Sequence, residues 1–214
     1  MIGDKLIVTD YHRQAAALIY KQIYQVLEKC EKPFAITIAG ESGSGKSETA
    51  VALADLINQA GLNVIILQQD DYFIYPPQTN HEKRIDDISW VGMQEVKLDL
   101  IDQHLEQVKS GSLKTLVKPL VHYEKDEIIQ EELTTDGVKV VIAEGTYTTA
   151  LKNADFKAFI DRTYLQTKKA RQVRSREKYS PFIERVLDIE HEIISSHKKI
   201  ADLIIPAPEE ESVN

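Results

Sequence analysis

The chain has 214 residues, enough for one domain with a substantial core, and 34 acidic against 26 basic side chains give it a net charge of −8. Such a surface repels nucleic acid and anionic membranes, so we expect neither as a partner. The single Cys30 excludes an internal disulfide. We find no signal peptide and no run near the roughly 18 apolar residues of a membrane helix, so we expect a cytoplasmic protein.

The first predicted elements are a helix and a buried strand. Residues 10–29 carry apolar side chains at helical spacing, with Asp10 as a cap and Pro33 just beyond the end. Residues 34–39 form a short apolar, β-branched run that is typical of a strand in a parallel sheet. Residues 48–57 are again helical in composition and spacing. A glycine-rich turn joins this strand to this helix.

That turn has the pattern of a phosphate-binding P-loop. It reads Gly-Glu-Ser-Gly-Ser-Gly-Lys-Ser, which matches Gly-x4-Gly-Lys-Ser/Thr. Gly43 and Gly45 let backbone N–H groups point inward, and the helix dipole adds positive potential. Lys46 would reach the β- and γ-phosphates of ATP, and the Ser47 hydroxyl would bind Mg²⁺. The residues expected to bind the nucleotide are Gly40, Glu41, Ser42, Gly43, Ser44, Gly45, Lys46, Ser47 and Glu48.

The rest of the chain alternates strands with helices. Further strands are predicted at residues 62–68, 138–143, 158–165 and 202–205. Helices are predicted at residues 95–110, 167–178 and 182–199, and short extended segments at 115–121 and 127–133. Residues 70–87 are polar and are predicted to be a loop. The pattern indicates an α/β P-loop NTPase fold, with a mostly parallel five-stranded sheet, helices on both faces and ligands at the carboxyl ends of the strands.

Residues 1–206 are expected to form a single domain with a small lid at about residues 167–180. Residues 207–214, which contain Pro208 and three consecutive glutamates, are expected to be a disordered tail.

Carboxylates follow two of the predicted strands at the P-loop edge. Asp70 and Asp71 come after residues 62–68, and either could accept the proton of a substrate hydroxyl and organise the water ligands of Mg²⁺. Neighbours in an extended segment face opposite ways, so only one should point at the phosphates. Glu144 ends the strand at 138–143, where a magnesium-organising acid of the Walker B type sits. The alternative for Asp70 and Asp71 is a solvated acidic turn, and the alternative for Glu144 is an ordinary acid at the end of a strand.

A basic run from Lys168 to Lys178 stands out in this acidic chain. Arg171 and Arg174 are three residues apart on a predicted helix and so share a face. Phosphoryl transfer needs a cation at the charge that develops during reaction, and a mobile lid can supply one while excluding water. A solvated basic helix is the alternative.

The order of these motifs resembles that of the uridine kinase and phosphoribulokinase family, over roughly residues 34–206. After the P-loop come Gln-Asp-Asp-Tyr-Phe, Ala-Glu-Gly-Thr-Tyr, the arginine run and Ala-Asp-Leu-Ile-Ile-Pro. Nicotinamide riboside kinases and bacterial pantothenate kinases are relatives. The resemblance implies an ATP- and Mg²⁺-dependent kinase that acts on a hydroxyl of a nucleoside, a vitamin or a sugar acid. It implies Asp70 as the catalytic base, Glu144 as its partner near the metal, and Arg171 or Arg174 as a lid arginine.

The acceptor region departs from the uridine kinase pattern. Uridine kinases carry Pro-x-Tyr-Asp-Phe followed by His and Arg, whereas residues 119–123 read Pro-Leu-Val-His-Tyr, with Val121 in place of the base-stacking tyrosine. We therefore expect uridine to be a poor substrate, and acceptor contacts to come from residues 72–84, His122 and Tyr123. Three side chains of the predicted loop would suit a phosphate or carboxylate on the acceptor: His81, Lys83 and Arg84.

Two other kinds of P-loop protein are alternatives, an ATPase or GTPase and a nucleotide-binding regulator without turnover. The chain has no Asn-Lys-x-Asp guanine motif, which disfavours a GTPase. A regulator would bind ATP without any acceptor-dependent release of ADP. The sequence leaves open whether copies of the chain associate into a homo-oligomer.

Overall fold

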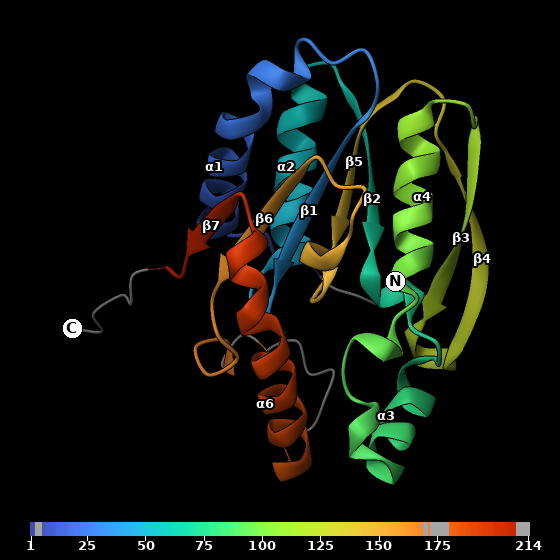
Figure 1. Ribbon diagram of the computed structural model, residues 1–214, viewed down its shortest axis with the longest axis vertical. Helices are drawn as coiled ribbons and strands as arrows, with labels where there is room; N and C mark the ends of the chain where they lie inside the picture. The colour runs from blue at the N-terminus through green and yellow to red at the C-terminus, as the bar shows by residue number, and fades with distance from the viewer. Residues whose placement is uncertain (3–5, 169–170, 172–179, 209–214) are drawn as a thin grey trace.

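The computed structural model describes residues 1–2, 6–168, 171 and 180–208 (Figure 1). Five parallel strands form one sheet in the order β2-β5-β1-β6-β7, and β3 and β4 form an antiparallel pair. The strands are β1 (Phe34–Gly40), β2 (Asn63–Gln68), β3 (Thr115–His122), β4 (Glu127–Thr134), β5 (Val138–Glu144), β6 (Phe156–Asp161) and β7 (Leu203–Pro206). The α-helices are α1 (Asp10–Leu27), α2 (Lys46–Gln59), α3 (Pro77–Asp86), α4 (Leu98–Ser110) and α6 (Pro181–Ser195).

Helices cover both faces of the five-stranded sheet. The central strand β1 is buried along its whole length because its alternate side chains enter two different cores. Ile36 and Ile38 pack with α1 and α2 in one core, whereas Ala35 and Ala39 pack with α4 in the other. Figure 1 shows α4 beside the β3-β4 pair. This architecture confirms the predicted α/β P-loop fold. Within the described part of the chain, no helix is long and apolar enough to cross a membrane.

The carboxyl ends of β1, β2 and β5 meet at one edge of the sheet. Ile38 of β1 and Gln68 of β2 are both in register with Glu144, the last residue of β5. The P-loop follows β1, and a 3₁₀ turn at Gln69–Tyr72 follows β2. The sequence-predicted acids and the phosphate loop are therefore placed along the same edge, where ligands of such sheets bind.

The prediction of a loop at residues 70–87 is wrong, because α3 occupies much of this segment. Only Asn80 of α3 is buried, so the helix has no apolar periodicity to reveal it. Its start is stabilised from outside: the Asp126 carboxylate, in the turn before β4, accepts the backbone N–H groups of Gln78 and Thr79 at 2.6 and 3.1 Å. This contact joins residues far apart in the chain, which a local pattern cannot show.

One predicted helix begins, and one predicted strand ends, at a different residue in the structure. The helix expected from residue 95 begins at Leu98, because the Glu95 carboxylate folds back and accepts the Gly92 N–H at 2.7 Å in a 3₁₀ turn. The strand expected at residues 158–165 is β6 and ends at Asp161.

Two predictions fall on segments outside the described residues. Most of the lid segment lies at 172–179, including Arg174, and most of the expected tail lies at 209–214. Of the two predicted lid arginines, the structure describes Arg171.

Candidate active site

The P-loop connects the central strand β1 to α2. Gly43 and Gly45 have φ angles of 74° and 97°, in the left-handed region that favours glycine. A side chain at position 45 would collide with His12 of α1, whose Nε2 lies 2.5 Å from the place its Cβ would take. Lys46 Nζ donates to the backbone oxygen of Glu41 at 2.9 Å, so the lysine lies across the loop. The turn and the lysine together form an anion-binding nest at a helix N-terminus.

Two oxygen-bearing side chains meet beside this nest. Ser47 Oγ donates a hydrogen bond to Glu144 Oε1 at 2.9 Å, and Glu144 is buried. A hydroxyl and a carboxylate are ligands that suit Mg²⁺, which usually completes its shell with water and substrate phosphates. Gly145 has a φ of 156°, and a Cβ there would lie 2.2 Å from the Gln69 side chain, so the turn after β5 requires glycine.

The two adjacent aspartates at the end of β2 have different surroundings. Asp71 is 1% exposed, and its carboxylate accepts Lys118 Nζ at 2.8 Å and the Val121 N–H at 3.0 Å. Asp70 instead borders a cavity that Ser42 of the P-loop also borders. The structure thus engages Asp71 in holding β3 against the sheet, and places Asp70 where a substrate could reach it.

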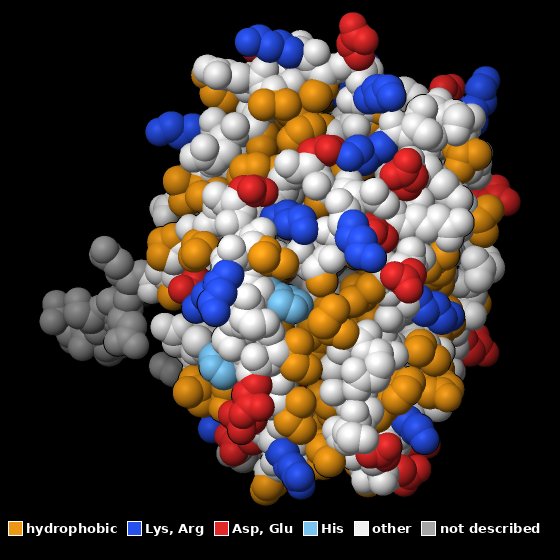
Figure 2. All heavy atoms as spheres, viewed as in Figure 1, with side chains coloured by type: hydrophobic (Ala, Val, Ile, Leu, Met, Phe, Trp, Pro, Cys, Tyr) orange, Lys and Arg blue, Asp and Glu red, His pale blue; other side chains and the backbone are white. Residues whose placement is uncertain are grey.

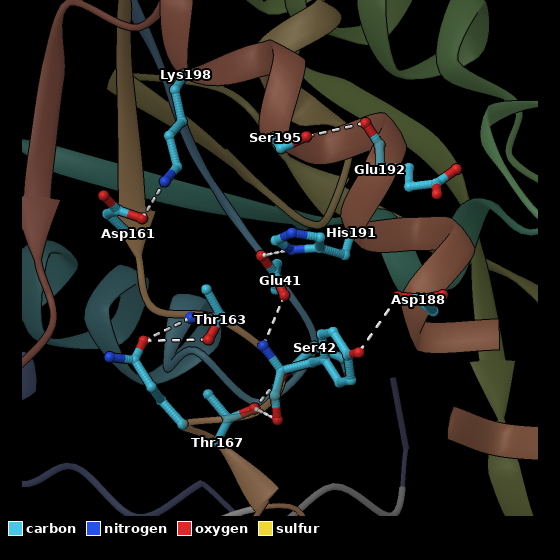
Figure 3. Close-up of polar contacts among 12 residues, drawn as sticks. Glu41, Ser42, Asp161, Thr163, Thr167, Asp188, His191, Glu192, Ser195 and Lys198 are labelled. Carbon is cyan, nitrogen blue, oxygen red and sulfur yellow. Dashed lines mark hydrogen bonds and ion pairs between the residues drawn. The ribbon is translucent and has the colours of Figure 1, made fainter. Parts of the chain in front are cut away.

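A polar cluster fixes the P-loop against α6 and the segment after β6 (Figure 3). The Glu41 carboxylate accepts the Tyr164 N–H at 2.6 Å, and its other oxygen lies 2.7 Å from His191 Nδ1. The Thr167 hydroxyl donates to the Ser42 carbonyl at 2.9 Å. The Glu41 side chain, expected among the nucleotide contacts, is therefore engaged in bracing the loop.

Arg171 lies against the P-loop. Its Nη1 donates to the Thr167 hydroxyl at 2.6 Å and to the Tyr164 carbonyl, and its guanidinium sits over the Tyr164 ring, 6.0 Å from the centroid. Its Cγ lies 2.7 Å from the place a Cβ on Gly43 would take. Arg171 borders the same cavity as Asp70.

The cavity has a volume of about 240 Å³ and lies between the P-loop, α3 and α6. Figure 2 shows hydrophobic side chains along the seam between these two helices. Side chains from the two segments expected to contact the acceptor border it: Phe73, Tyr75, Asn80, His81, Arg84 and Tyr123. Tyr72, at the start of the first segment, is instead a core residue: it is 0% exposed and its hydroxyl is 2.9 Å from His104 Nδ1. Val121, just before the second segment, is also 0% exposed.

An ion-pair network joins α3 to α6 beside this cavity. The fully buried Glu95 accepts Arg84 Nε at 2.6 Å and Nη2 at 3.1 Å, and the same Nη2 lies 3.1 Å from Glu190 Oε1. Burial lowers the pKa of Arg84, but Glu190 and Glu95 outweigh it and hold the pKa above its ordinary value. Arg84 is thus already paired with two carboxylates, which disagrees with its expected role in holding an anionic acceptor group. Arg84 and Glu190 are 106 positions apart, so no local motif could reveal the network.

A P-loop on the central strand, an acid at the end of the adjacent strand and a cavity at the same edge define a P-loop phosphotransferase. The sequence model of the phosphoribulokinase / uridine kinase family matches residues 35–213 of this chain. The chain therefore belongs to this family, as its motifs predict, and is a kinase that acts on an alcohol group.

Known proteins similar to this chain agree with this assignment. A uridine kinase of Macrococcus caseolyticus (strain JCSC5402) is 29% identical over 185 residues, which cover 80% of this chain and 86% of that protein. A bifunctional alpha-galactosidase/sucrose kinase of Mediterraneibacter gnavus is 28% identical over 203 residues, which cover 86% of this chain and 22% of that longer protein. A solved structure described as a possible uridine kinase from Bacillus stearothermophilus has a TM-score of 0.64 at 17% identity, covers 90% of this chain and 98% of its own, and shows the shared fold.

Proposed function

We propose that this protein transfers the γ-phosphoryl group of ATP to a hydroxyl group of a small metabolite, as a uridine kinase-like enzyme. One observation carries the proposal: Asp70, the P-loop and Arg171 border the same cavity. A hydroxyl held there lies between a carboxylate that can accept its proton and a loop built for nucleotide phosphates.

The nucleotide end of the site uses the P-loop and the acid after β5. Lys46 and the N–H groups of the loop hold the β- and γ-phosphates. Ser47 and Glu144, in contact at 2.9 Å, would hold Mg²⁺, and Asp70 would help to order its water ligands. Bound ATP would supply the phosphoryl group, and bound Mg²⁺ would neutralise part of its negative charge. Groups fixed in advance at such a site stabilise the transferring phosphoryl without reorganising.

The acceptor end of the site uses Asp70 as the base. Its carboxylate accepts the hydroxyl proton while the hydroxyl oxygen bonds to the γ-phosphorus and the bond to the ADP oxygen breaks. Arg171 stabilises the charge on the transferred phosphoryl from the P-loop side of the cavity. Arg174 is proposed to join it when the lid closes.

The names of the similar proteins support an acceptor that is a small molecule with several hydroxyl groups. Their names identify kinases of uridine and, in the bifunctional protein, of sucrose. We take the acceptor of this chain to be a nucleoside or a sugar.

The test is the release of ADP by the purified protein with ATP and Mg²⁺, measured with and without nucleosides, vitamins, sugars and sugar acids. We expect at least one acceptor to raise ADP release well above the rate with water alone. An unchanged rate with every acceptor, despite tight ATP binding, would contradict the proposal and favour a nucleotide-binding regulator.

A further inference from the structure

Thr167 joins Arg171 to the P-loop through a single hydroxyl group. The hydroxyl donates to the Ser42 carbonyl at 2.9 Å (Figure 3) and accepts a hydrogen bond from Arg171 Nη1 at 2.6 Å. The Tyr164 carbonyl, at 3.2 Å, is a second acceptor for the same proton. A threonine hydroxyl has one proton and two lone pairs, so it can donate to the loop and accept from the guanidinium together. Arg171 is therefore tied to the phosphate loop, although the two are far apart in the sequence.

This contact is screened from water. Thr167 is 0% exposed, and its Cβ lies 3.2 Å from the place that a Cβ on Gly43 would take. In such surroundings a hydrogen bond to a charged group is stronger than in water, and the guanidinium polarises the hydroxyl that donates to Ser42. The contact therefore fixes Arg171 Nη1 relative to the loop more firmly than an exposed hydrogen bond would.

Tyr164 restricts the plane of the same guanidinium. Arg171 Nη1 also donates to the Tyr164 carbonyl, and the guanidinium lies over the Tyr164 ring, 6.0 Å from its centroid. Tyr164 is itself held at both ends: its backbone N–H donates to the Glu41 carboxylate at 2.6 Å, and its hydroxyl donates to Asp188 of α6 at 3.3 Å. Because the guanidinium is planar, two acceptors at one nitrogen and a ring against its face limit its orientation as well as its position.

Arg171 is held where the proposed reaction needs a cation. Its Cγ lies 2.7 Å from the place that a Cβ on Gly43 would take, and it borders the cavity together with Ser42 and Asp70. A charge that is already in place does not have to reorganise when negative charge develops on the transferred phosphoryl. A misplacement of about 1 Å at such a site can lower the rate by about 100-fold. The group that sets the position of Arg171 should therefore affect the rate.

We propose that Thr167 is a positioning residue for phosphoryl transfer, whose hydroxyl fixes Arg171 over the P-loop before the acceptor binds. This inference rests on the proposed kinase function, in which Arg171 stabilises the charge on the transferred phosphoryl. Thr167 acts only through Arg171 in this account. The alternative is a threonine that merely stabilises its own turn, in which the Thr167 N–H donates to the Thr163 carbonyl at 3.0 Å.

The first test replaces Thr167 with valine and with serine. Thr167→Val keeps the shape of the side chain and removes the hydroxyl, whereas Thr167→Ser keeps the hydroxyl. We expect Thr167→Val to lower kcat by about 10-fold, as the loss of one hydrogen bond to a charged group implies, with KM for ATP nearly unchanged. Thr167→Ser should retain most of the kcat of the unmodified protein.

The matched control is Thr163→Val, in the same turn, where the hydroxyl donates to Gln166 at 3.3 Å. We expect this control to keep the kcat of the unmodified protein. An unchanged kcat in Thr167→Val, or an equal loss in Thr163→Val, would overturn the inference and leave the kinase function standing. No acceptor-dependent release of ADP by the unmodified protein would overturn both.

The second test asks whether Thr167 acts through Arg171, and it needs no turnover. Calorimetry measures the binding of ADP, Mg²⁺ and aluminium fluoride, which together imitate the transferring phosphoryl group, in the presence of the best acceptor. We expect Thr167→Val to weaken this binding by about 10-fold in the unmodified background and by less than about 2-fold in an Arg171→Ala background, while the affinity for ADP alone stays constant. Equal losses in both backgrounds would show that Thr167 acts independently of Arg171 and would overturn the inference.

Discussion

Ser47 and Glu144 are 97 positions apart in the chain, yet Ser47 Oγ donates to Glu144 Oε1 at 2.9 Å. The sheet brings them together, because β5 is the parallel neighbour of β1 and its last residue is in register with Ile38, just before the P-loop. The contact links the phosphate loop to the acid after β5 at the place where a nucleotide-bound metal would lie.

Replacing Glu144 with glutamine tests whether this contact serves a metal. Glu144→Gln keeps the size of the side chain and removes the charge, so Mg²⁺ should bind more weakly. At Mg²⁺ concentrations that saturate the unmodified protein we expect a loss of roughly 100-fold in kcat, partly rescued by more Mg²⁺. A magnesium titration of ADP release measures this. Activity that is lost and does not respond to metal would argue for a purely structural acid.

Asp70→Asn tests the assignment of the base. The change should leave ATP affinity nearly intact and lower kcat by about 100-fold or more, because asparagine cannot accept the proton of the acceptor hydroxyl. ATP affinity from calorimetry and kcat from ADP release separate the two effects. A mild effect of Asp70→Asn on kcat would contradict its assignment as the base.

Asp71→Asn should act on stability. Asp71 is buried and paired with Lys118 at 2.8 Å, so removing its charge leaves a buried ammonium with a weaker partner. We expect the free energy of unfolding to fall by roughly 3 kcal/mol, the lower end for a broken buried pair, because Lys118 also contacts Glu131 at 3.0 Å. Urea denaturation measures it, with the exposed Asp136→Asn as the control. Equal stability of the two variants would show that the Asp71 pair contributes nothing to the fold.

Asp126→Gly tests the external cap of α3. Asp126 has a φ of 51°, which glycine adopts without strain, so the substitution removes the cap and leaves the turn unstrained. Losing a cap costs about 0.5–2 kcal/mol, and here it should loosen the helix that carries Asn80 and Arg84. We expect KM for the acceptor to rise several-fold while KM for ATP stays constant. A parallel rise in both constants would indicate a general loss of structure.

The P-loop and the central strands could be predicted because their signals are local. Residues 34–47 contain an apolar β-branched run and a fixed-spacing glycine motif, and each is readable within a few positions. Glu144 could be placed beside the P-loop because it ends a strand of the same parallel sheet.

The acceptor side could not be predicted because its structure depends on distant contacts. The helix α3 has no apolar stripe, and its first turn is held by Asp126 from another part of the chain. Arg84 was expected to hold an anion, but Glu190, far along the chain, pairs with it. The residues alone also did not decide which of Asp70 and Asp71 faces the phosphates. Their surroundings differ because Lys118 in β3 pairs with Asp71.

The most direct test of the account is ADP release by Lys46→Ala in the presence of ATP, Mg²⁺ and the best acceptor of the unmodified protein. Lys46 is the lysine of the phosphate nest. Its loss should remove roughly several kcal/mol of phosphate stabilisation, which is what a fixed charged group contributes at such a site. We expect turnover to be abolished and the thermal unfolding midpoint to change little, because Lys46 is only partly buried. Turnover at the rate of the unmodified protein would contradict the assignment of this loop as the phosphoryl-transfer site.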